Sequence, residues 1–324
     1  MIISRTPLRI SLVGGGSDLP SFYQQHGGAV LSFSIRKYIY LAMHEYFEPK
    51  GYILKYSHVE TPQTVDQIQH RIIRQVFSDL QVDRVDLSSS ADVPTGTGMG
   101  SSSAFTVGLL NVCHAYQGRH VSRAALAEQA CAVEIEKLGE PIGKQDQYGC
   151  ALGGINFIEF THDGTVMHEA VPLSGQQREQ LENNLLLFYL GGSRSASEIL
   201  ARQSKNSASK ADVIENLKFM ADQARQLRGD ICRDVDVIGE YLKEGWRRKR
   251  ELAQGISNPL IDNAYERALE AGATGAKLLG AGGSGFLLVY APRSAREAVI
   301  QSLSEFELHN VSIDYAGASI AYSD

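Results

Sequence analysis

The segment from Pro94 to Ala104 combines glycines and hydroxyl side chains in a spacing that suits anion binding. Three glycines at alternate positions free the backbone to turn its amides inward, where they can form a nest for negative charge. Three serines follow, and the apolar run to Tyr116 predicts a helix whose first amides are unpaired. This chemistry suits a phosphate group, although a glycine-rich turn before a serine-capped helix is the plain structural alternative. The residues expected at the anion are Pro94, Gly96, Gly98, Met99, Gly100, Ser101, Ser102 and Ser103.

Two further glycine motifs could suggest other nucleotide sites. Gly143-Lys144 is followed by Gln145, whereas a Walker A motif requires Ser or Thr after its Gly-Lys pair. Gly280–Gly285 fits the letters of a dinucleotide fingerprint, but that fingerprint opens a helix, and Phe286–Tyr290 reads as a strand. The sequence therefore favours neither a Walker A loop nor a dinucleotide site.

The order of the predicted elements indicates an α+β fold, because strands and helices do not alternate strictly. Strands predominate early, and helices predominate from about residue 193 to residue 269. We place a domain boundary near residue 180, which gives an N-terminal domain over 1–180 and a C-terminal domain over 181–324. The predicted strands are Arg9–Gly14, Ala29–Ile35, Tyr38–Phe47, Val85–Val93, Ile155–Phe160, Thr165–Val171, Leu185–Leu190, Phe286–Tyr290 and Val311–Ala316. The other predicted helices are Thr64–Leu80, a helix from the N-cap Ser122 to Leu138, and Ser294–Phe306.

Composition excludes several classes of function. The chain has 324 residues, 43% of them hydrophobic, and a net charge of −6, so no broad nucleic-acid face is expected. The one basic run, Trp246–Arg250, is interpreted as a solvated helix face. The four cysteines form no CxxC pair and the nine histidines lack metal-ligand spacing, so we expect neither a disulfide framework nor a zinc site. Without a signal-like start or a long apolar run, the expected location is the cytoplasm, away from membranes.

Three segments together resemble the motifs of the GHMP superfamily, named for galactokinase, homoserine kinase, mevalonate kinase and phosphomevalonate kinase. Pro7–Asp18 resembles the first motif, and Pro94–Ala104 resembles the second, the phosphate loop. Lys277–Leu287 resembles the third, a glycine-rich turn packed beside that loop. The resemblance spans nearly the whole chain and implies ATP as the phosphate donor. It also implies an N-terminal domain like domain 2 of ribosomal protein S5 and a ferredoxin-like C-terminal domain of helices and strands.

A fourth match concerns two acids. In galactokinase-like members a magnesium-binding glutamate precedes an Asp-Gln pair by about twelve residues, and Glu134 stands twelve residues before Asp146. The resemblance implies that Glu134 and Ser102 bind Mg²⁺ and that Asp146 accepts or orients the proton of the acceptor hydroxyl. The plain alternatives are a helix-face pair of Glu134 with Lys137 and a capping or surface role for Asp146. The implied catalytic set is Asp146 together with Arg9 and Lys144, the candidate cations that keep it ionised.

The expected acceptor is a sugar or a sugar phosphate. Asp18 follows three glycines at a strand end, where it could accept hydrogen bonds from sugar hydroxyls; an Asx-turn is the alternative. Galactokinase carries Glu-His where this chain has Gly15-Gly16, which argues against galactose. Arg194, near a helix start, is the candidate for a distal phosphate. The expected substrate contacts are Gly15, Gly16, Ser17, Asp18, Arg194, Gly282 and Gly283.

Within the superfamily, three stretches most resemble the heptose 7-phosphate kinases, which phosphorylate an anomeric hydroxyl, and L-fucose kinases are near relatives. Those stretches are Val13–Pro20, Gly143–Tyr148 and Leu187–Leu200. A non-catalytic sensor of sugar and ATP is the alternative from a different class, and the presence of all three implied catalytic and metal-binding side chains favours catalysis. A decarboxylase or an isoprenoid kinase is disfavoured by the Gly14–Asp18 segment. Both a monomer and a homodimer are compatible with the sequence.

Overall fold

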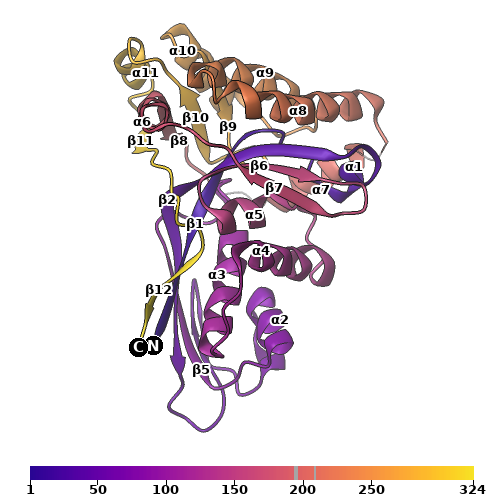
Figure 1. Cartoon of the computed structure of the whole chain (residues 1–324), viewed down its shortest axis with the longest axis vertical. Helices are drawn as coiled ribbons and strands as arrows, with labels where there is room; N and C mark the ends of the chain where they lie inside the picture. Colours follow the sequence, from indigo (N-terminus) through magenta and orange to yellow (C-terminus); the bar gives the residue numbers. More distant parts are fainter. Residues whose placement is uncertain (193–195, 208) are drawn as a thin grey trace.

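A computed structural model describes residues 1–192, 196–207 and 209–324, so the predicted phosphate ligand Arg194 lies outside the described residues. Within them, an eight-stranded sheet and a four-stranded sheet are flanked by helices (Figure 1). The predicted α+β class is therefore confirmed.

The first sheet is built around two long antiparallel strands, β1 (Ile2–Val13) and β2 (Gly28–Glu45). We predicted two strands where β2 runs unbroken. Tyr38 pairs with Pro7 while Ile35 pairs with Leu8, so the two intervening residues of β2 form a bulge rather than a turn. The two halves of β2 have different partners, β6 (Ile155–Phe160) and β5 (Val85–Ala91). Its length lets one strand carry both arms of the sheet.

Two of the helices, α3 (Ser101–Tyr116) and α5 (Gln145–Leu152), pack against β1 and β2. The helix α3 is apolar and buried around almost its whole circumference, and it lies against both strands. Ser122 caps α4 (Arg123–Cys131) as predicted, by accepting a hydrogen bond from the Ala125 amide at 3.3 Å. That helix continues into a π-helical turn over Ala132–Lys137, and α5 follows.

The second sheet has the strand order β11 (Glu307–Asn310), β8 (Leu185–Tyr189), β10 (Phe286–Tyr290) and β9 (Gly275–Leu278). Successive residues of β8 enter different hydrophobic clusters: Leu185 and Leu187 join the larger one, whereas Leu186 and Phe188 join the second. This burial on both faces explains why β8 is a continuous apolar run rather than an alternating one.

The last strand of the chain lies beside the first. The strand β12 (Ser319–Ser323) pairs with β1, and Figure 1 shows the two termini side by side. The predicted closing strand Val311–Ala316 is wrong, since that stretch makes only an isolated bridge between Ile313 and Ile35. The second sheet begins after residue 184, whereas β12 returns to the first sheet, and the domain boundary near residue 180 stays a prediction.

The remaining helices and strands flank or extend the two sheets. The predicted helix Thr64–Leu80 is split into a 3₁₀ turn and α2, because the chain bends between residues 67 and 71. No helix in the described part of the chain is long and apolar enough to cross a membrane. The other bounds are α1 (Pro20–His26), β3 (Ile53–Lys55), β4 (Val59–Glu60), a 3₁₀ turn (Val65–Gln67), α2 (Arg71–Leu80), β7 (Val166–Ala170), α6 (Gly175–Asn184), α7 (Ala196–Ser207), α8 (Ala211–Asp230), a 3₁₀ turn (Val235–Val237), α9 (Ile238–Arg250), α10 (Pro259–Glu270) and α11 (Arg296–Ser302).

Candidate active site

The glycine- and serine-rich segment forms a loop that opens into the N-terminus of α3. Gly100 caps this helix with a φ of +75°, in the left-handed region that glycine enters at little cost. The first turn of α3, with its unpaired amides, lines a cavity of about 320 Å³. The loop residues that line the cavity are Gly96, Gly98, Gly100, Ser101, Ser102 and Ser103.

The glycine-rich turn before β10 packs directly on this loop, as the resemblance implied. A Cβ on Gly98 would lie 2.6 Å from the Leu279 carbonyl oxygen, and a Cβ on Gly280 would overlap the Gly98 Cα. Only glycine lets the two backbones approach so closely. The contact brings a segment near residue 280 to the loop near residue 98, so both sheets contribute walls to one cavity.

Glu134 reaches the cavity from the π-helical turn that follows α4. Its carboxylate is buried and accepts hydrogen bonds from Ser102 Oγ at 2.9 Å and Gln147 Nε2 at 2.6 Å. Burial raises the pKa of Glu134 above its ordinary value, although both hydrogen bonds oppose that change. The alternative pairing with Lys137 is wrong, because that ammonium pairs with Asp79 at 2.9 Å. Glu134 lies within this π-helical turn, a rare kind of helix that is frequent at functional sites.

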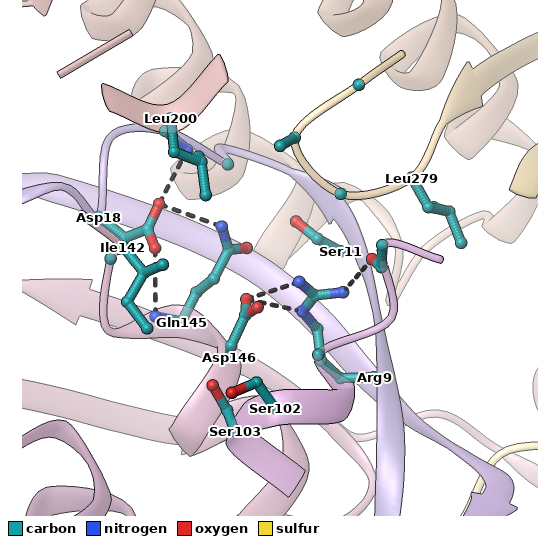
Figure 2. Close-up of a pocket in the computed structure, with 18 of the residues that line it drawn as sticks. Arg9, Ser11, Asp18, Ser102, Ser103, Ile142, Gln145, Asp146, Leu200 and Leu279 are labelled. Carbon is teal, nitrogen blue, oxygen red and sulfur yellow. Dashed lines mark hydrogen bonds and ion pairs between the residues drawn. The ribbon is translucent and has the colours of Figure 1, made fainter. Parts of the chain in front are cut away.

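Asp146 lies in the first turn of α5 and forms an ion pair with Arg9 of β1 (Figure 2). Arg9 Nη2 and Nε donate to Asp146 Oδ1 at 2.6 Å and 2.9 Å. The third nitrogen, Nη1, donates to the Gly98 carbonyl at 2.7 Å. The guanidinium is buried while the carboxylate remains partly open to the cavity, so Arg9 fixes Asp146 beside the loop.

Lys144, the second cation expected beside Asp146, lies elsewhere. Its ammonium donates to the Gly164 carbonyl at 2.7 Å and stands 5.6 Å from the centre of the Tyr23 ring. The residue precedes the first turn of α5, and its side chain extends toward the β6–β7 turn rather than into the cavity. Of the two candidate cations, Arg9 and Lys144, only Arg9 pairs with Asp146.

Asp18 is a buried carboxylate at the other end of the cavity (Figure 2). It accepts hydrogen bonds from the Gly16 amide at 2.8 Å, the Gln145 amide at 3.2 Å and Gln145 Nε2 at 3.1 Å. Burial, and then the charge of Asp146, raises the pKa of Asp18. The bond to Gly16 resembles the local turn that we had kept as an alternative, but contacts 127 positions away show that Asp18 also joins the loop after β1 to α5.

Four expected contacts do not line the cavity. Met99 is fully buried in the core, and Pro94 lies exposed before the loop turns inward. Ser17 Oγ donates to the Gly14 and Ala29 carbonyls and so holds the backbone together. The Gly283 amide donates to the Ile256 carbonyl, away from the cavity that neighbouring Gly282 lines. Gly15 and Gly16 line it as expected.

Two lysines of the cavity wall escaped the sequence analysis. Lys249 of α9 and Lys277 of β9 are both buried and both line the cavity. The interpretation of Trp246–Arg250 as a solvated face is therefore wrong for two of its members, since Trp246 is also fully buried. Residues three apart share a helix face, so the tryptophan three positions earlier was the signal that Lys249 points inward.

Ser102 and Glu134 offer oxygen ligands of the kind that Mg²⁺ prefers. The described residues contain no group of three His, Cys, Asp or Glu side chains that could hold a metal ion. A pair consisting of one hydroxyl and one carboxylate nevertheless fits Mg²⁺, because this ion keeps several waters and takes its other ligands from bound phosphates. The 2.9 Å contact between the two side chains is compatible with a shared ion.

Comparisons with known proteins agree with this geometry. The family model described as GHMP kinases N terminal domain matches residues 67–154, and the one described as GHMP kinases C terminal matches residues 220–307. A D-glycero-alpha-D-manno-heptose 7-phosphate kinase from Campylobacter jejuni is 25% identical, with 93% of each chain covered. A bifunctional fucokinase/GDP-fucose pyrophosphorylase from Arabidopsis thaliana is 28% identical over 88% of this chain, which spans 29% of that enzyme.

Solved structures share the fold over the whole chain. A D-glycero-D-manno-heptose 1-phosphate kinase from Bacteroides thetaiotaomicron superposes with a TM-score of 0.82 at 21% identity, covering 100% of both chains. A galactokinase from Lactococcus lactis superposes with a TM-score of 0.74 at 16% identity, covering 98% of this chain and 94% of that one.

Proposed function

The chain belongs to the GHMP kinase family, and from that premise we propose that it transfers the γ-phosphate of ATP to the anomeric hydroxyl of a heptose 7-phosphate. The observation that carries the proposal is the convergence of three parts on one cavity: the phosphate loop, Glu134 and Asp146. The relative from Campylobacter jejuni supports the acceptor, since its name gives a heptose 7-phosphate as substrate.

The proposed reaction is an in-line displacement. The acceptor oxygen bonds to the γ-phosphorus, the bond from that phosphorus to the β–γ bridging oxygen breaks, and ADP leaves with the electron pair. The hydroxyl proton passes to Asp146, the carboxylate of the site that remains partly open to the cavity. Arg9 fixes Asp146 next to the loop at Gly98.

The donor nucleotide would be bound by the loop amides and the N-terminus of α3, where the helix dipole favours phosphate oxygens. Ser102 and Glu134 would hold Mg²⁺, which when bound neutralises charge on the phosphates. Gln147 donates to the second oxygen of Glu134 and so keeps that carboxylate turned toward Ser102.

The acceptor would lie between the loop and Asp18. Gly15 and Gly16 line this wall with backbone, and the side chain of Gln203 packs against Gly16. Asp18 is already fixed by three donors, and its outward oxygens would accept from sugar hydroxyls. The Arabidopsis relative makes L-fucose the second candidate acceptor.

The test is ADP release with D-glycero-D-manno-heptose 7-phosphate, the same heptose without phosphate, L-fucose, galactose and mevalonate. We expect the highest kcat/KM with the heptose 7-phosphate and a product phosphorylated at the anomeric carbon, as measured by ³¹P NMR. Binding of ATP without turnover of any acceptor would instead support the sensor alternative, and a preference for L-fucose would replace the proposed substrate.

A further inference from the structure

One wall of the cavity carries two ammonium groups that are almost entirely withdrawn from solvent. Lys249 is 7% exposed and Lys277 is 5% exposed. Lysine is almost never buried to this degree unless a partner compensates its charge. In the described part of the chain, however, no carboxylate lies within 4.0 Å of either ammonium nitrogen. Two buried cations without an anion therefore need an explanation.

Lys277 is largely explained by its contacts. Its Nζ donates to the Ser11 carbonyl at 2.9 Å and to the Leu12 carbonyl at 2.9 Å, so two of its three N–H groups are used within the protein. These bonds join β9 of the second sheet to β1 of the first. Lys277 thus has a structural role at the junction of the sheets.

Lys249 uses only part of its hydrogen-bonding capacity within the protein. Its one hydrogen bond in the described structure goes to the Gly280 carbonyl, which leaves two of its three N–H groups free at the cavity wall. Gly280 itself rests on Gly98 of the phosphate loop. Lys249 therefore lies beside the turn that packs on the phosphate loop.

Lys249 lines the same cavity as Asp18, the carboxylate proposed to bind the acceptor. Burial and the positive charge of Arg9 lower the pKa of Lys249 to about 8, while Asp18 and Asp146 oppose that change. Lys249 is therefore available to an anion bound in the same cavity as Asp18.

We infer that Lys249 binds a phosphate ester carried by the acceptor and that it is the residue that selects a phosphorylated sugar over the free sugar. The inference rests on the proposed function and deepens it, because it assigns the recognition of the second phosphate to a buried amine on α9. Phosphate oxygens would supply the missing countercharge and accept the free N–H groups. The same N–H groups could bind a phosphate of ATP, and the experiment distinguishes the phosphate of the acceptor from those of ATP.

The experiment compares Lys249→Met with Lys243→Met, the same change at an exposed lysine of the same helix. With D-glycero-D-manno-heptose 7-phosphate we expect kcat/KM to fall about 10- to 100-fold in Lys249→Met, the loss typical of a hydrogen bond to a charged group. With the unphosphorylated heptose, and for KM of ATP, we expect changes within about twofold. Lys243→Met should match the wild type on all three measurements.

A charge-preserving variant and a pH profile make the test independent of folding. Lys249→Arg should retain the preference for the phosphorylated sugar. The wild-type kcat/KM for the heptose 7-phosphate should fall as the pH rises through about 8, because the amine loses its proton there, and Lys249→Arg should show no such fall. The groups facing Lys249 are Arg9, Asp18, Asp146 and Lys277, and the same measurements with the free heptose account for their titration.

Several results would overturn the inference. An equal loss of kcat/KM with the phosphorylated and free sugars, a rise confined to KM of ATP, or a pH profile shared by wild type and Lys249→Arg would each do so. A wild-type enzyme that turns over only unphosphorylated sugars would overturn the proposed substrate instead. If Lys249→Met does not fold, as judged by its thermal transition, Lys249→Arg and the two pH profiles still decide.

Discussion

Asp146, the proposed proton acceptor, is held by the buried guanidinium of Arg9. The guanidinium uses two nitrogens on one carboxylate oxygen and a third on the Gly98 carbonyl, so the acid is tied to the loop where the phosphate would lie. The guanidinium of Arg9 thus fixes the position of Asp146 relative to the loop.

The first prediction concerns this pair. Asp146→Asn should lower kcat by about 100- to 10,000-fold, the usual contribution of a positioned base, while KM of ATP changes little. Lys144→Met should leave kcat within about threefold of the wild type, because its ammonium bonds Gly164 and not Asp146. Steady-state kinetics of both variants check this. A large loss of kcat in Lys144→Met would show that the lysine moves to Asp146 during turnover.

Glu134, the proposed Mg²⁺ ligand, is a carboxylate whose burial works against the stability of the fold. Its pKa is raised by burial, so the folded protein holds the proton more readily than the unfolded chain. The ionised form therefore destabilises the fold at neutral pH, and this cost disappears as the pH falls through the folded-state pKa.

A second prediction follows for Glu134→Gln. We expect Tm at pH 7 to rise by about 2–4 °C, with the gain shrinking toward pH 4, while Mg²⁺-dependent turnover is largely lost. The new amide finds a partner because Gln147 Oε1 has none and its side chain can rotate to accept. Calorimetry across pH, with the exposed Glu128→Gln on the preceding helix as control, measures the gain. A lower Tm at pH 7 would mean that the carboxylate's hydrogen bonds outweigh its burial.

At the scale of elements, the close approach of two glycine-rich turns forms the cavity. Gly98 lies in the loop between β5 and α3, and Gly280 lies in the turn between β9 and β10. The two glycines touch through their backbones, and the unpaired amides of α3 lie beside them. A side chain at either position would separate the turns.

The third prediction tests that contact. Gly98→Ala adds both a clash with the Leu279 carbonyl and strain at a φ of +85°, and should lower the free energy of unfolding by about 2–4 kcal/mol and raise KM of ATP at least tenfold. Gly118→Ala is the matched control. Its φ is +69° and nothing lies within 4 Å of the added Cβ, so it should cost only about 1–2 kcal/mol with no effect on ATP. Equal costs for the two variants, measured in urea, would assign the effect to backbone strain alone.

Sequence patterns predicted elements well where the signal was local. Ser122 was recognised as a cap, and the serines after Gly100 were placed at a helix start, because such signals depend on a few adjacent residues. The chain break expected at Arg36 and Lys37 is a bulge within one strand. Two adjacent polar residues give the same sequence pattern in a turn and in a bulge, so the pattern could not distinguish the two. Lys249 was missed because a basic run resembles a solvated face unless its tryptophan is used to orient the helix.

At the scale of the whole molecule, both sheets contribute to a single cavity. Residues of β1, α3 and α5 form one part of its lining, and residues of α9 and of the turn between β9 and β10 form another. This assembly was beyond local patterns, because it depends on contacts such as that of Lys277 with Ser11, which are 266 positions apart. The sequence motifs contain most of the residues that line the cavity, but they do not show how these segments come together in space.

Lys277 offers a test of how strongly the two sheets are joined. Burial, and then the charges of Lys249 and Arg9, lower its pKa well below the ordinary lysine value. The unfolded chain therefore binds this proton more readily than the folded protein, so the contribution of Lys277 to stability grows as the pH rises toward about 10.4, the lysine pKa of the unfolded chain. At high pH the neutral amine keeps its bonds to Ser11 and Leu12 without the cost of a buried charge.

We accordingly predict that Lys277→Met has a lower Tm than the wild type and that the difference widens between pH 7 and pH 10. Two lost hydrogen bonds should cost about 1–3 kcal/mol once the burial of charge no longer offsets them. Differential scanning calorimetry at several pH values measures the difference, with the exposed Lys243→Met as control. Because the lost bonds join the two sheets, the variant should also unfold over a broader temperature range than the wild type. A difference in Tm that narrows with rising pH would show that the ammonium form, with its charge, is what holds the sheets together.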